Sequence, residues 1–343
     1  MIYRSVLRPL LFRFEPEAAH ELALQTLSLT LSTRWARDVA ANHFKSATDF
    51  GELRRFGLTF KNPIGLAAGF DKNGRAAREF AALGFGFVEV GTLTFEPQTG
   101  NKKPRLFRLP KDKALINRLG FNNEGAAKIV ERLKKLNPNC VLGVNIGKNK
   151  SVENEDAIEN YKASFDLASE VADYIAVNVS SPNTPNLREL QKADALEKLL
   201  TALQTNTGVQ TSCPLLVKIA PDLAEAEIEA IVDICLRLKI DGIIATNTTV
   251  SRENLQTKID EIGGLSGKPL ENRSNQVIRQ IYRHSKGKLS IVGVGGIFTA
   301  EDAFEKIAAG ACLLQAYTGF IYQGITFARD VNVGLAEILQ AKG

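Results

Sequence analysis

The segment "IVGVGGIFTAEDAFEKIAAGACLLQAYTG" (Ile291–Gly319) contains the unit from which the fold of this chain can be worked out. It begins with a continuous apolar run, which is typical of a strand covered on both faces. A glycine-rich turn follows, and then a helix whose first turn is acidic. A second apolar run and another glycine-containing turn complete the segment. It therefore predicts a strand, a helix and a parallel strand in succession.

Similar apolar runs, separated by helical segments, recur along the chain. Eight such units in roughly 280 residues favour an α/β fold of the (β/α)8 TIM barrel type, with a doubly wound open sheet as the alternative. The long connection from Thr92 to Asn139 is expected to lie over the barrel mouth, because long ordered loops are usually functional. The expected strands are "IGLAA" (Ile64–Ala68), "GFVEVG" (Gly86–Gly91), "CVLGVNI" (Cys140–Ile146), "YIAVNV" (Tyr174–Val179), "LLVKI" (Leu215–Ile219), "GIIATN" (Gly242–Asn247), "SIVGVGG" (Ser290–Gly296) and "CLLQAY" (Cys312–Tyr317).

Residues 1–40 differ from the rest of the chain and predict two short amphipathic helices. Glu15, Pro16 and Glu17 form a helix-start signal, with proline early and acids in the first turn. Arginine and aromatic residues accompany the apolar ones, so the segment is either a helical cap on the barrel or an interfacial membrane contact. We therefore divide the chain into an N-terminal two-helix extension, 1–40, and a barrel, 41–343.

The composition is that of a soluble globular protein, with 44% hydrophobic and 24% charged residues. A net charge of +5 permits an anionic ligand or membrane surface but does not call for nucleic acid. The four cysteines form no CxxC pair, so neither a metal site nor an iron–sulfur cluster is expected. No apolar run reaches the roughly 18 residues of a membrane-spanning helix, and no signal-peptide cleavage pattern is present.

The predicted carboxyl ends of the strands, where a barrel places its active site, are rich in amides. An amide offers donors and an acceptor but transfers no proton, so a ring of amides suits a pyrimidine or a flavin. The alternative is that these asparagines cap helices and turns. Glycine turns after strands seven and eight favour a phosphate site. The asparagines are Asn117, Asn145, Asn178, Asn183 and Asn247.

Two lysines are candidates for binding negative charge. Lys218 stands inside the apolar run "LLVKI" and should have an anionic partner, unless it extends to solvent. Lys72 follows the first strand in "GFDKNG", where Asp71 is expected to cap the next helix. None of the three histidines lies at a predicted strand end, which argues against histidine general-base catalysis.

A series of motifs spread over nearly the whole chain resembles, in the same order, those of the membrane-associated, quinone-linked class of dihydroorotate dehydrogenase. This class is expected to hold one FMN per chain and to oxidise (S)-dihydroorotate to orotate in pyrimidine (UMP) synthesis. The motifs are "LAAGFDKNG", "EVGTLTFEPQTGNKKPRLFRL", "INRLGFNN", "VNIGKNK", "VNVSSPNTPNLREL", "LLVKIAPDL", "IIATNTT", "GGLSGKPL" and "IVGVGGI", together with "EPEAAHELAL" near the N-terminus.

The resemblance implies residue roles that composition and spacing alone do not give. Ser181 would be the base that takes the C5 proton while the C6 hydride passes to flavin N5, with Thr184 on a water-mediated proton path. His20 and Arg108, with Tyr317, would line a quinone tunnel. FMN would contact Ala68, Gly69, Thr92, Asn145, Asn178, Lys218, Thr246, Gly267, Gly296, Tyr317 and Thr318. The substrate would contact Lys72, Asn117, Arg118, Leu119, Gly120, Phe121, Asn183, Asn247 and Thr248.

The choice of class depends on the serine in this loop and on the N-terminal helices. Soluble relatives use a cysteine base, and some add an iron–sulfur subunit, which is not expected here. The resemblance implies a peripheral protein on the cytoplasmic face of the cell membrane, without transit peptide or nucleic-acid partner. The alternatives are a soluble-class dihydroorotate dehydrogenase, a flavin-dependent tRNA dihydrouridine synthase, which would want a catalytic cysteine and a basic RNA-binding region, and a non-catalytic membrane-binding barrel.

Overall fold

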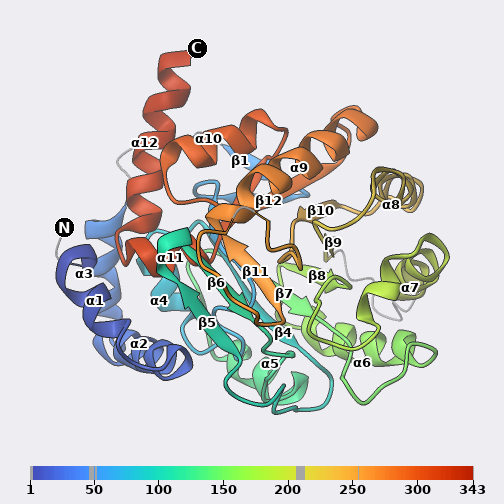
Figure 1. The fold of residues 1–343 in the computed structure, drawn as a ribbon, viewed down its shortest axis with the longest axis horizontal. Helices are drawn as coiled ribbons and strands as arrows, with labels where there is room; N and C mark the ends of the chain where they lie inside the picture. Colours follow the sequence, from blue (N-terminus) through green and yellow to red (C-terminus); the bar gives the residue numbers. More distant parts are fainter. Residues whose placement is uncertain (1–2, 46–49, 51, 206–212, 254, 343) are drawn as a thin grey trace.

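The fold is a closed parallel barrel, seen in a computed structural model that describes residues 3–45, 50, 52–205, 213–253 and 255–342 (Figure 1). Its strands follow one another around the barrel in the order β10-β12-β13-β3-β4-β7-β8-β9, so the sheet has no free edge. All the predicted strands are confirmed. They are β3 (Ile64–Leu66), β4 (Phe87–Leu93), β7 (Val141–Ile146), β8 (Tyr174–Asn178), β9 (Leu215–Ile219), β10 (Gly242–Ala245), β12 (Ser290–Val294) and β13 (Leu313–Ala316).

Helices surround the barrel because each has one apolar face. In α5, for example, Ala126, Ile129, Val130 and Leu133 are buried at spacings of one helical turn, while the charged residues between them face solvent. The surrounding helices are α4 (Ala77–Ala82), α5 (Ala126–Lys134), α6 (Ala157–Ser169), α7 (Ala193–Thr205), α8 (Glu225–Arg237), α9 (Glu271–Ser285), α10 (Ala300–Ala308) and α12 (Phe327–Lys342), with short helices η3 (Leu187–Gln191), η4 (Lys268–Leu270) and α11 (Thr318–Gln323) at their starts or between them.

The amino-terminal end of the barrel is closed by an antiparallel hairpin of β1 (Leu53–Arg55) and β2 (Leu58–Phe60). The ring of Phe60 packs edge-on against Phe87 with centroids 5.3 Å apart, and Phe56 packs against Tyr174 at 5.8 Å. These aromatic contacts fill the base of the barrel. A ligand that reaches the interior must therefore enter from the opposite, carboxyl-terminal end.

The carboxyl-terminal end carries a small antiparallel sheet, in the order β11-β6-β5. Its strands are β5 (Leu106–Leu109), β6 (Ala114–Asn117) and β11 (Gly264–Gly267), with the turn η2 (Pro110–Asp112) between the first two. β5 and β6 belong to the long connection that the sequence places over the barrel mouth, and β11 comes from the connection after β10. The two insertions thus form one small sheet at the barrel mouth (Figure 1), and its strands β5, β6 and β11 with their connections are called the roof below.

The N-terminal extension contains a π-helical turn η1 (Tyr3–Leu7) continuing into α1 (Arg8–Leu11), then α2 (Pro16–Thr30) and α3 (Arg34–Phe44). Glu15 caps α2 by accepting the backbone N–H of Ala18, as its sequence predicts. The two expected helices are present, and a third that was not expected begins where Thr33 caps α3 and extends beyond residue 40. The extension is fixed to the barrel by Tyr3, whose hydroxyl donates to the carbonyl of Ile321 at 2.6 Å.

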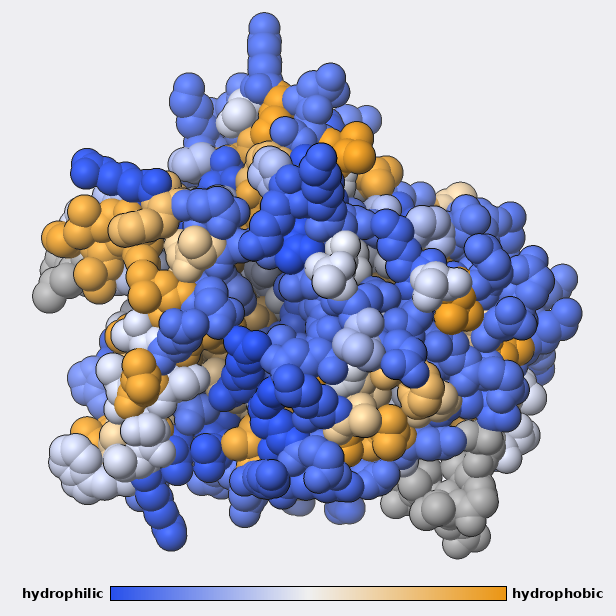
Figure 2. Space-filling view, turned by 90° about the horizontal axis from the view of Figure 1, so that it is seen from below, coloured by the Kyte–Doolittle hydropathy of each residue, from blue (hydrophilic) through white to orange (hydrophobic). Residues whose placement is uncertain are grey.

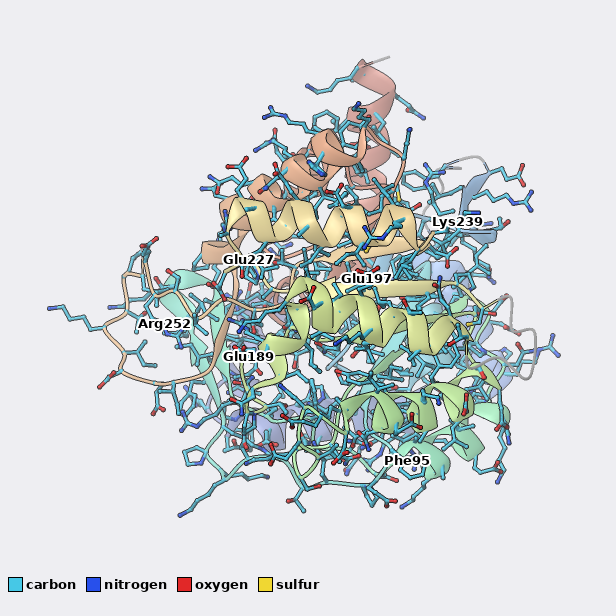
Figure 3. All side chains as sticks on the ribbon, turned by 90° about the vertical axis from the view of Figure 1, so that its right-hand side faces the viewer. Phe95, Glu189, Glu197, Glu227, Lys239 and Arg252 are labelled. Atoms are coloured by element: carbon cyan, nitrogen blue, oxygen red, sulfur yellow. The ribbon has the colours of Figure 1, made fainter. Side chains whose placement is uncertain are left out.

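Apolar side chains gather on the outer face of these helices, at the left of Figure 2. No helix of the described residues is both long and apolar enough to cross a membrane. The opposite side of the molecule is charged, with Glu197, Glu227 and Lys239 on or beside the outer helices (Figure 3). The exposed apolar residues of the extension are Val6, Leu7, Leu10, Phe14, Leu22, Leu29, Trp35 and Val39.

Candidate active site

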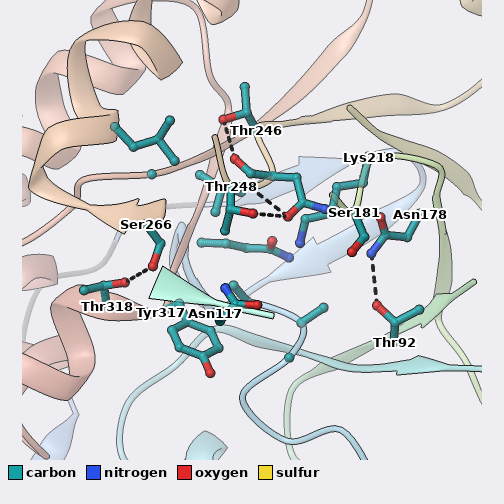
Figure 4. Close-up of a pocket in the computed structure, with 18 of the residues that line it drawn as sticks. Thr92, Asn117, Asn178, Ser181, Lys218, Thr246, Thr248, Ser266, Tyr317 and Thr318 are labelled. Carbon is teal, nitrogen blue, oxygen red and sulfur yellow. Dashed lines mark hydrogen bonds between the residues drawn. The ribbon is translucent and has the colours of Figure 1, made fainter. Parts of the chain in front are cut away.

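A cleft of about 960 Å³ opens at the carboxyl-terminal end of the barrel (Figure 4). Its walls come from the ends of the strands and from the roof insertions. The residues named above for flavin and substrate that line it are Ala68, Gly69, Lys72, Thr92, Asn117, Leu119, Gly120, Phe121, Asn178, Ser181, Asn183, Lys218, Thr246, Asn247, Thr248, Gly267, Gly296, Tyr317 and Thr318.

Asn145 does not line the cleft but lies beneath it, in a buried hydrogen-bond network. Its carbonyl oxygen accepts the hydroxyl of Thr92 at 2.5 Å and the amide of Asn178 at 3.2 Å. Asn178 also donates to the Thr92 hydroxyl at 3.0 Å (Figure 4). Because each donor is matched to an acceptor, the amides that face the cleft are held in one orientation.

Arg118 also does not line the cleft, and its guanidinium points away from it. It pairs with the carboxylate of Glu261 and lies over the ring of Phe107, 4.6 Å from the centroid. A side-chain contact to substrate, as the resemblance implies for this position, does not fit this geometry. Any contact from Arg118 would have to come from its backbone.

The anionic partner expected for Lys218 is Glu89, whose Oε1 lies 3.8 Å from the lysine Nζ. Glu89 is wholly buried in β4, where it also accepts hydrogen bonds from Tyr174 at 2.9 Å and Gln315 at 2.7 Å. Burial lowers the pKa of Lys218, and Glu89 opposes that shift. Glu89 was not predicted as this partner, although a charged residue inside "FVEV" is the same signal that marked Lys218.

Ser181 is buried at the wall of the cleft on the loop after β8. Its Oγ accepts the backbone N–H of Asn183 at 3.2 Å, which fixes the side chain relative to the loop. The neighbouring Ser180 hydroxyl instead donates to Asn178 and accepts from Asn247, so it belongs to the amide network. Thr184 is 4% exposed, and its hydroxyl has no hydrogen-bond partner among the described residues.

Lys72 faces the cleft without a counter-charge. Its ammonium has no carboxylate within ion-pair distance in the part of the chain that the structure describes. It also lines a neighbouring pocket that contains Glu17 and Asn73, and burial lowers its pKa to about 8. An unpaired buried cation favours an anionic ligand, because the ligand would replace the lost solvation.

The other end of the cleft has the geometry of a phosphate cradle. Gly267 and Gly296 have φ values of +103° and +79°, and a Cβ on Gly296 would lie 2.4 Å from Cβ of Glu271. The Thr318 hydroxyl is hydrogen-bonded to Ser266 at 2.8 Å. The side-chain carbonyl oxygen of Gln315, inside the barrel, is buried and has no hydrogen-bond partner among the residues that the structure describes. Backbone N–H groups, a hydroxyl and an unpaired amide oxygen together fit a flavin mononucleotide.

A second cavity of about 860 Å³ lies between α2 and the barrel and is mainly apolar. His20 and Arg108 line it, and burial lowers the pKa of His20 to about 4, so its imidazole is neutral at physiological pH. Arg108 donates to the carbonyl of Phe14 at 2.8 Å. Tyr317 lines both cavities and thus forms the wall between them.

The described residues contain no cluster of side chains that could hold a metal ion. All four cysteines are free, and burial raises the pKa values of Cys140, Cys213 and Cys235 to about 12. Such thiols are poor nucleophiles at neutral pH.

Comparison with known proteins agrees with this geometry. The family model described as dihydroorotate dehydrogenase matches residues 52–339. A Christiangramia forsetii protein named dihydroorotate dehydrogenase (quinone) is 50% identical over 338 residues, covering 98% of this chain and 99% of the relative. A Gloeobacter violaceus protein of the same name is 50% identical, covering 100% and 96%. The crystal structure of the Eimeria tenella DHODH in complex with ferulenol has a TM-score of 0.84 at 39% identity, covering 96% and 93%.

Proposed function

The chain belongs to the dihydroorotate dehydrogenase family, and we propose that one of its two cavities serves the oxidation of dihydroorotate and the other the reduction of a quinone. The protein is an oxidoreductase of pyrimidine synthesis that oxidises dihydroorotate with a quinone as acceptor. The observation that carries the proposal is the position of Tyr317. Its ring separates a polar, amide-lined cleft from an apolar cavity, as a reaction with one polar and one lipid-soluble substrate requires.

FMN is proposed to occupy the cleft with its phosphate at the glycine cradle. When bound, it accepts a hydride from the substrate and passes two electrons to the quinone. Thr318 and the backbone around Gly267 and Gly296 would hold the phosphate. Lys218 would lie where reduction builds negative charge, and Glu89 would keep its side chain in place.

Dihydroorotate is proposed to bind between the roof and the loop after β8. Lys72 would bind its carboxylate, because the ammonium lacks another partner. The amides of Asn117, Asn183 and Asn247 would bind the alternating N–H and C=O groups of the ring and orient C6 for hydride transfer. Contacts from the backbone of 118–121 and from Thr248 would complete the pocket.

Ser181 is proposed to take the C5 proton. A serine hydroxyl is a weak base and must pass the proton on. The buried, unpartnered hydroxyl of Thr184 lies three residues along the same loop and can bind a water molecule there. We assign Thr184 to this proton path, since an orphaned buried hydroxyl is otherwise unfavourable.

The quinone is proposed to enter the apolar cavity beneath α2. The neutral imidazole of His20 and the guanidinium of Arg108 would supply hydrogen bonds to the quinone oxygens. The exposed apolar residues of 1–40 would rest in the membrane interface, so that a quinone can reach the cavity from lipid. We accordingly propose a peripheral membrane protein at the cytoplasmic face of the cell membrane.

The experiment is to purify the full chain, identify the released flavin, and measure turnover with dihydroorotate and a short-chain quinone. We expect FMN at one per chain and turnover that needs both substrates. Arg108→Leu should raise the KM for quinone and leave the rate of flavin reduction by dihydroorotate unchanged. Colourless protein, or equal effects of Arg108→Leu on both half-reactions, would overturn the division between the two cavities.

A further inference from the structure

We propose that Asn101 is a positioning residue of the dihydroorotate site, held in place by an ion pair between Glu17 of the N-terminal extension and Arg105. The inference rests on the function proposed above. It makes the extension part of the site for dihydroorotate as well as the entrance for the quinone. None of these three residues lines the cleft, so each would act through its neighbours.

Asn101 joins the two segments between which the substrate is proposed to bind. Its side-chain amide donates to the carbonyls of Arg118 at 3.0 Å and Asn183 at 3.1 Å. Its backbone N–H donates to the carbonyl of Leu119 at 3.0 Å. Asn183 in turn donates from its own side-chain amide to the side-chain oxygen of Asn117 at 3.1 Å. The roof segment and the loop that carries Ser181 are thus connected through one side chain.

The packing around Asn101 leaves it little freedom. Gly120 has a φ of +73°, and a Cβ there would lie 2.7 Å from the Asn101 amide. Gly100 has a φ of +77°, and a Cβ there would lie 2.3 Å from the carbonyl of Leu119. The two glycines permit the segment around Asn101 to approach the segment around Leu119 closely, and any larger residue at either position would push the two segments apart.

Arg105 connects this cluster to α2. Its Nη1 donates to the carbonyls of Thr99 at 2.6 Å and Asn101 at 2.9 Å. Its Nε and Nη2 bind both carboxylate oxygens of Glu17 at 2.9 to 3.1 Å. The Arg105 side chain is 8% exposed and that of Glu17 is 15% exposed, so solvent screens the pair only weakly.

The ion pair remains charged across the physiological range. Burial alone would raise the pKa of Glu17, but the hydrogen bonds and charge of Arg105 outweigh it and leave that pKa below its usual value. Removing the Glu17 charge would leave Arg105 buried without a counter-ion, and its contacts to Thr99 and Asn101 would loosen. Because the Asn101 amide also donates to the carbonyl of Asn183, a displaced Asn101 would loosen the position of Asn183 as well.

The test is calorimetric titration of orotate into the FMN-loaded full chain of four proteins: wild type, Asn101→Asp, Asn101→Ala and Glu17→Gln. Asn101→Asp retains the acceptor oxygen and loses both donors. We expect the Kd for orotate and the KM for dihydroorotate to rise roughly tenfold in both Asn101 variants, equivalent to two modest hydrogen bonds. The KM for quinone and the affinity for FMN should stay within twofold.

Lys150→Met is the matched control, because Lys150 is exposed and its ammonium donates to the side-chain oxygen of Asn101 at 3.0 Å, not to the amide nitrogen that joins the two segments. It should leave orotate binding within twofold of wild type. The double variant Glu17→Gln with Asn101→Ala should bind orotate about as weakly as Asn101→Ala alone, because both changes break the same connection.

Normal orotate binding by the Asn101 variants would overturn the inference. Equal losses of FMN and orotate would also overturn it, because they would indicate general damage to the barrel. Additive losses in the double variant would remove Glu17 from the connection. A wild-type protein that holds FMN but binds no orotate would instead contradict the proposed function.

Discussion

Glu89 and Lys218 form a buried ion pair across the interior of the barrel, with Oε1 and Nζ 3.8 Å apart and neither side chain more than 6% exposed. The two residues come from β4 and β9, on opposite sides of β7 and β8. Tyr174 and Gln315 satisfy the second oxygen of Glu89. The carboxylate of Glu89 keeps Lys218 charged at the base of the cleft, where burial alone would favour the neutral amine.

Replacing Glu89 by glutamine should destabilise the protein by about 3 kcal/mol, because it leaves Lys218 buried without a counter-charge. Urea unfolding at pH 7 would measure the loss. Tyr174→Phe is the control: it removes the hydrogen bond to Glu89 and a longer one from Gln315 at 3.3 Å, but it leaves no charge unpaired and should cost only about 1 kcal/mol. Equal stability of Glu89→Gln and wild type would show that the pair contributes nothing to the fold.

Ser181→Ala should slow flavin reduction by dihydroorotate by roughly 10²- to 10⁴-fold, because it removes the group that takes the C5 proton. FMN content and orotate binding should be retained. Stopped-flow absorbance at the flavin band is the measurement. The neighbouring Ser180→Ala, which alters only the amide network, should change the rate far less. A Ser181→Ala protein reduced at the wild-type rate would exclude this base.

Thr184→Val keeps the volume of the threonine side chain and removes its unpartnered hydroxyl. If that hydroxyl holds a water on the proton path, flavin reduction should slow by about tenfold or more while orotate affinity stays constant. The variant should not be less stable, because the hydroxyl has no protein partner to lose. An unchanged reduction rate would remove Thr184 from the path.

Orotate affinity should depend on pH through Lys72, whose pKa is lowered to about 8 by burial. The charged ammonium binds the carboxylate, so affinity is full below pH 8. It should fall about tenfold per pH unit above that pKa, where the lysine loses its proton. Calorimetry between pH 6.5 and 9.5 would measure this. Lys72→Met should bind weakly with no such dependence, whereas exposed Lys288→Met should behave as wild type.

Membrane contact can be followed at a single residue, because Trp35 is the only tryptophan of the chain and is 75% exposed on α3. Its fluorescence should shift to shorter wavelength when anionic lipid vesicles are added. Leu29→Ser, at another highly exposed apolar residue of the extension, should weaken co-sedimentation with vesicles several-fold. Ile262→Ser, equally exposed on a distant loop, is the control. A Trp35 spectrum unaffected by vesicles would contradict a docking role for 1–40.

The sequence predicted much of the barrel and the composition of its cleft for a physical reason. Continuous apolar strands identify a parallel sheet, and closing that sheet brings the strand ends together. Asn178 and Asn247 could therefore be expected to meet, although 69 residues separate them. The need for a partner to Lys218 was likewise evident from the cost of burying its charge.

Other features depend on contacts that no local pattern encodes. The identity of Glu89 as the partner of Lys218 follows only from the strand order around the barrel. The Arg118 side chain turns outward because Phe107 of the adjacent strand β5 and Glu261, 143 residues further along the chain, lie there. The Glu17–Arg105 pair joins two charged residues 88 positions apart, and each alone resembles an ordinary surface residue.

The most direct test of the account is anaerobic mixing of the purified, oxidised protein with dihydroorotate, followed by the flavin absorbance. We predict rapid bleaching of the oxidised flavin band, release of orotate at one per flavin, and recovery of the band when a quinone is added. A flavin that stays oxidised in excess dihydroorotate would contradict the central claim, because the cleft would then hold a cofactor that this substrate cannot reduce.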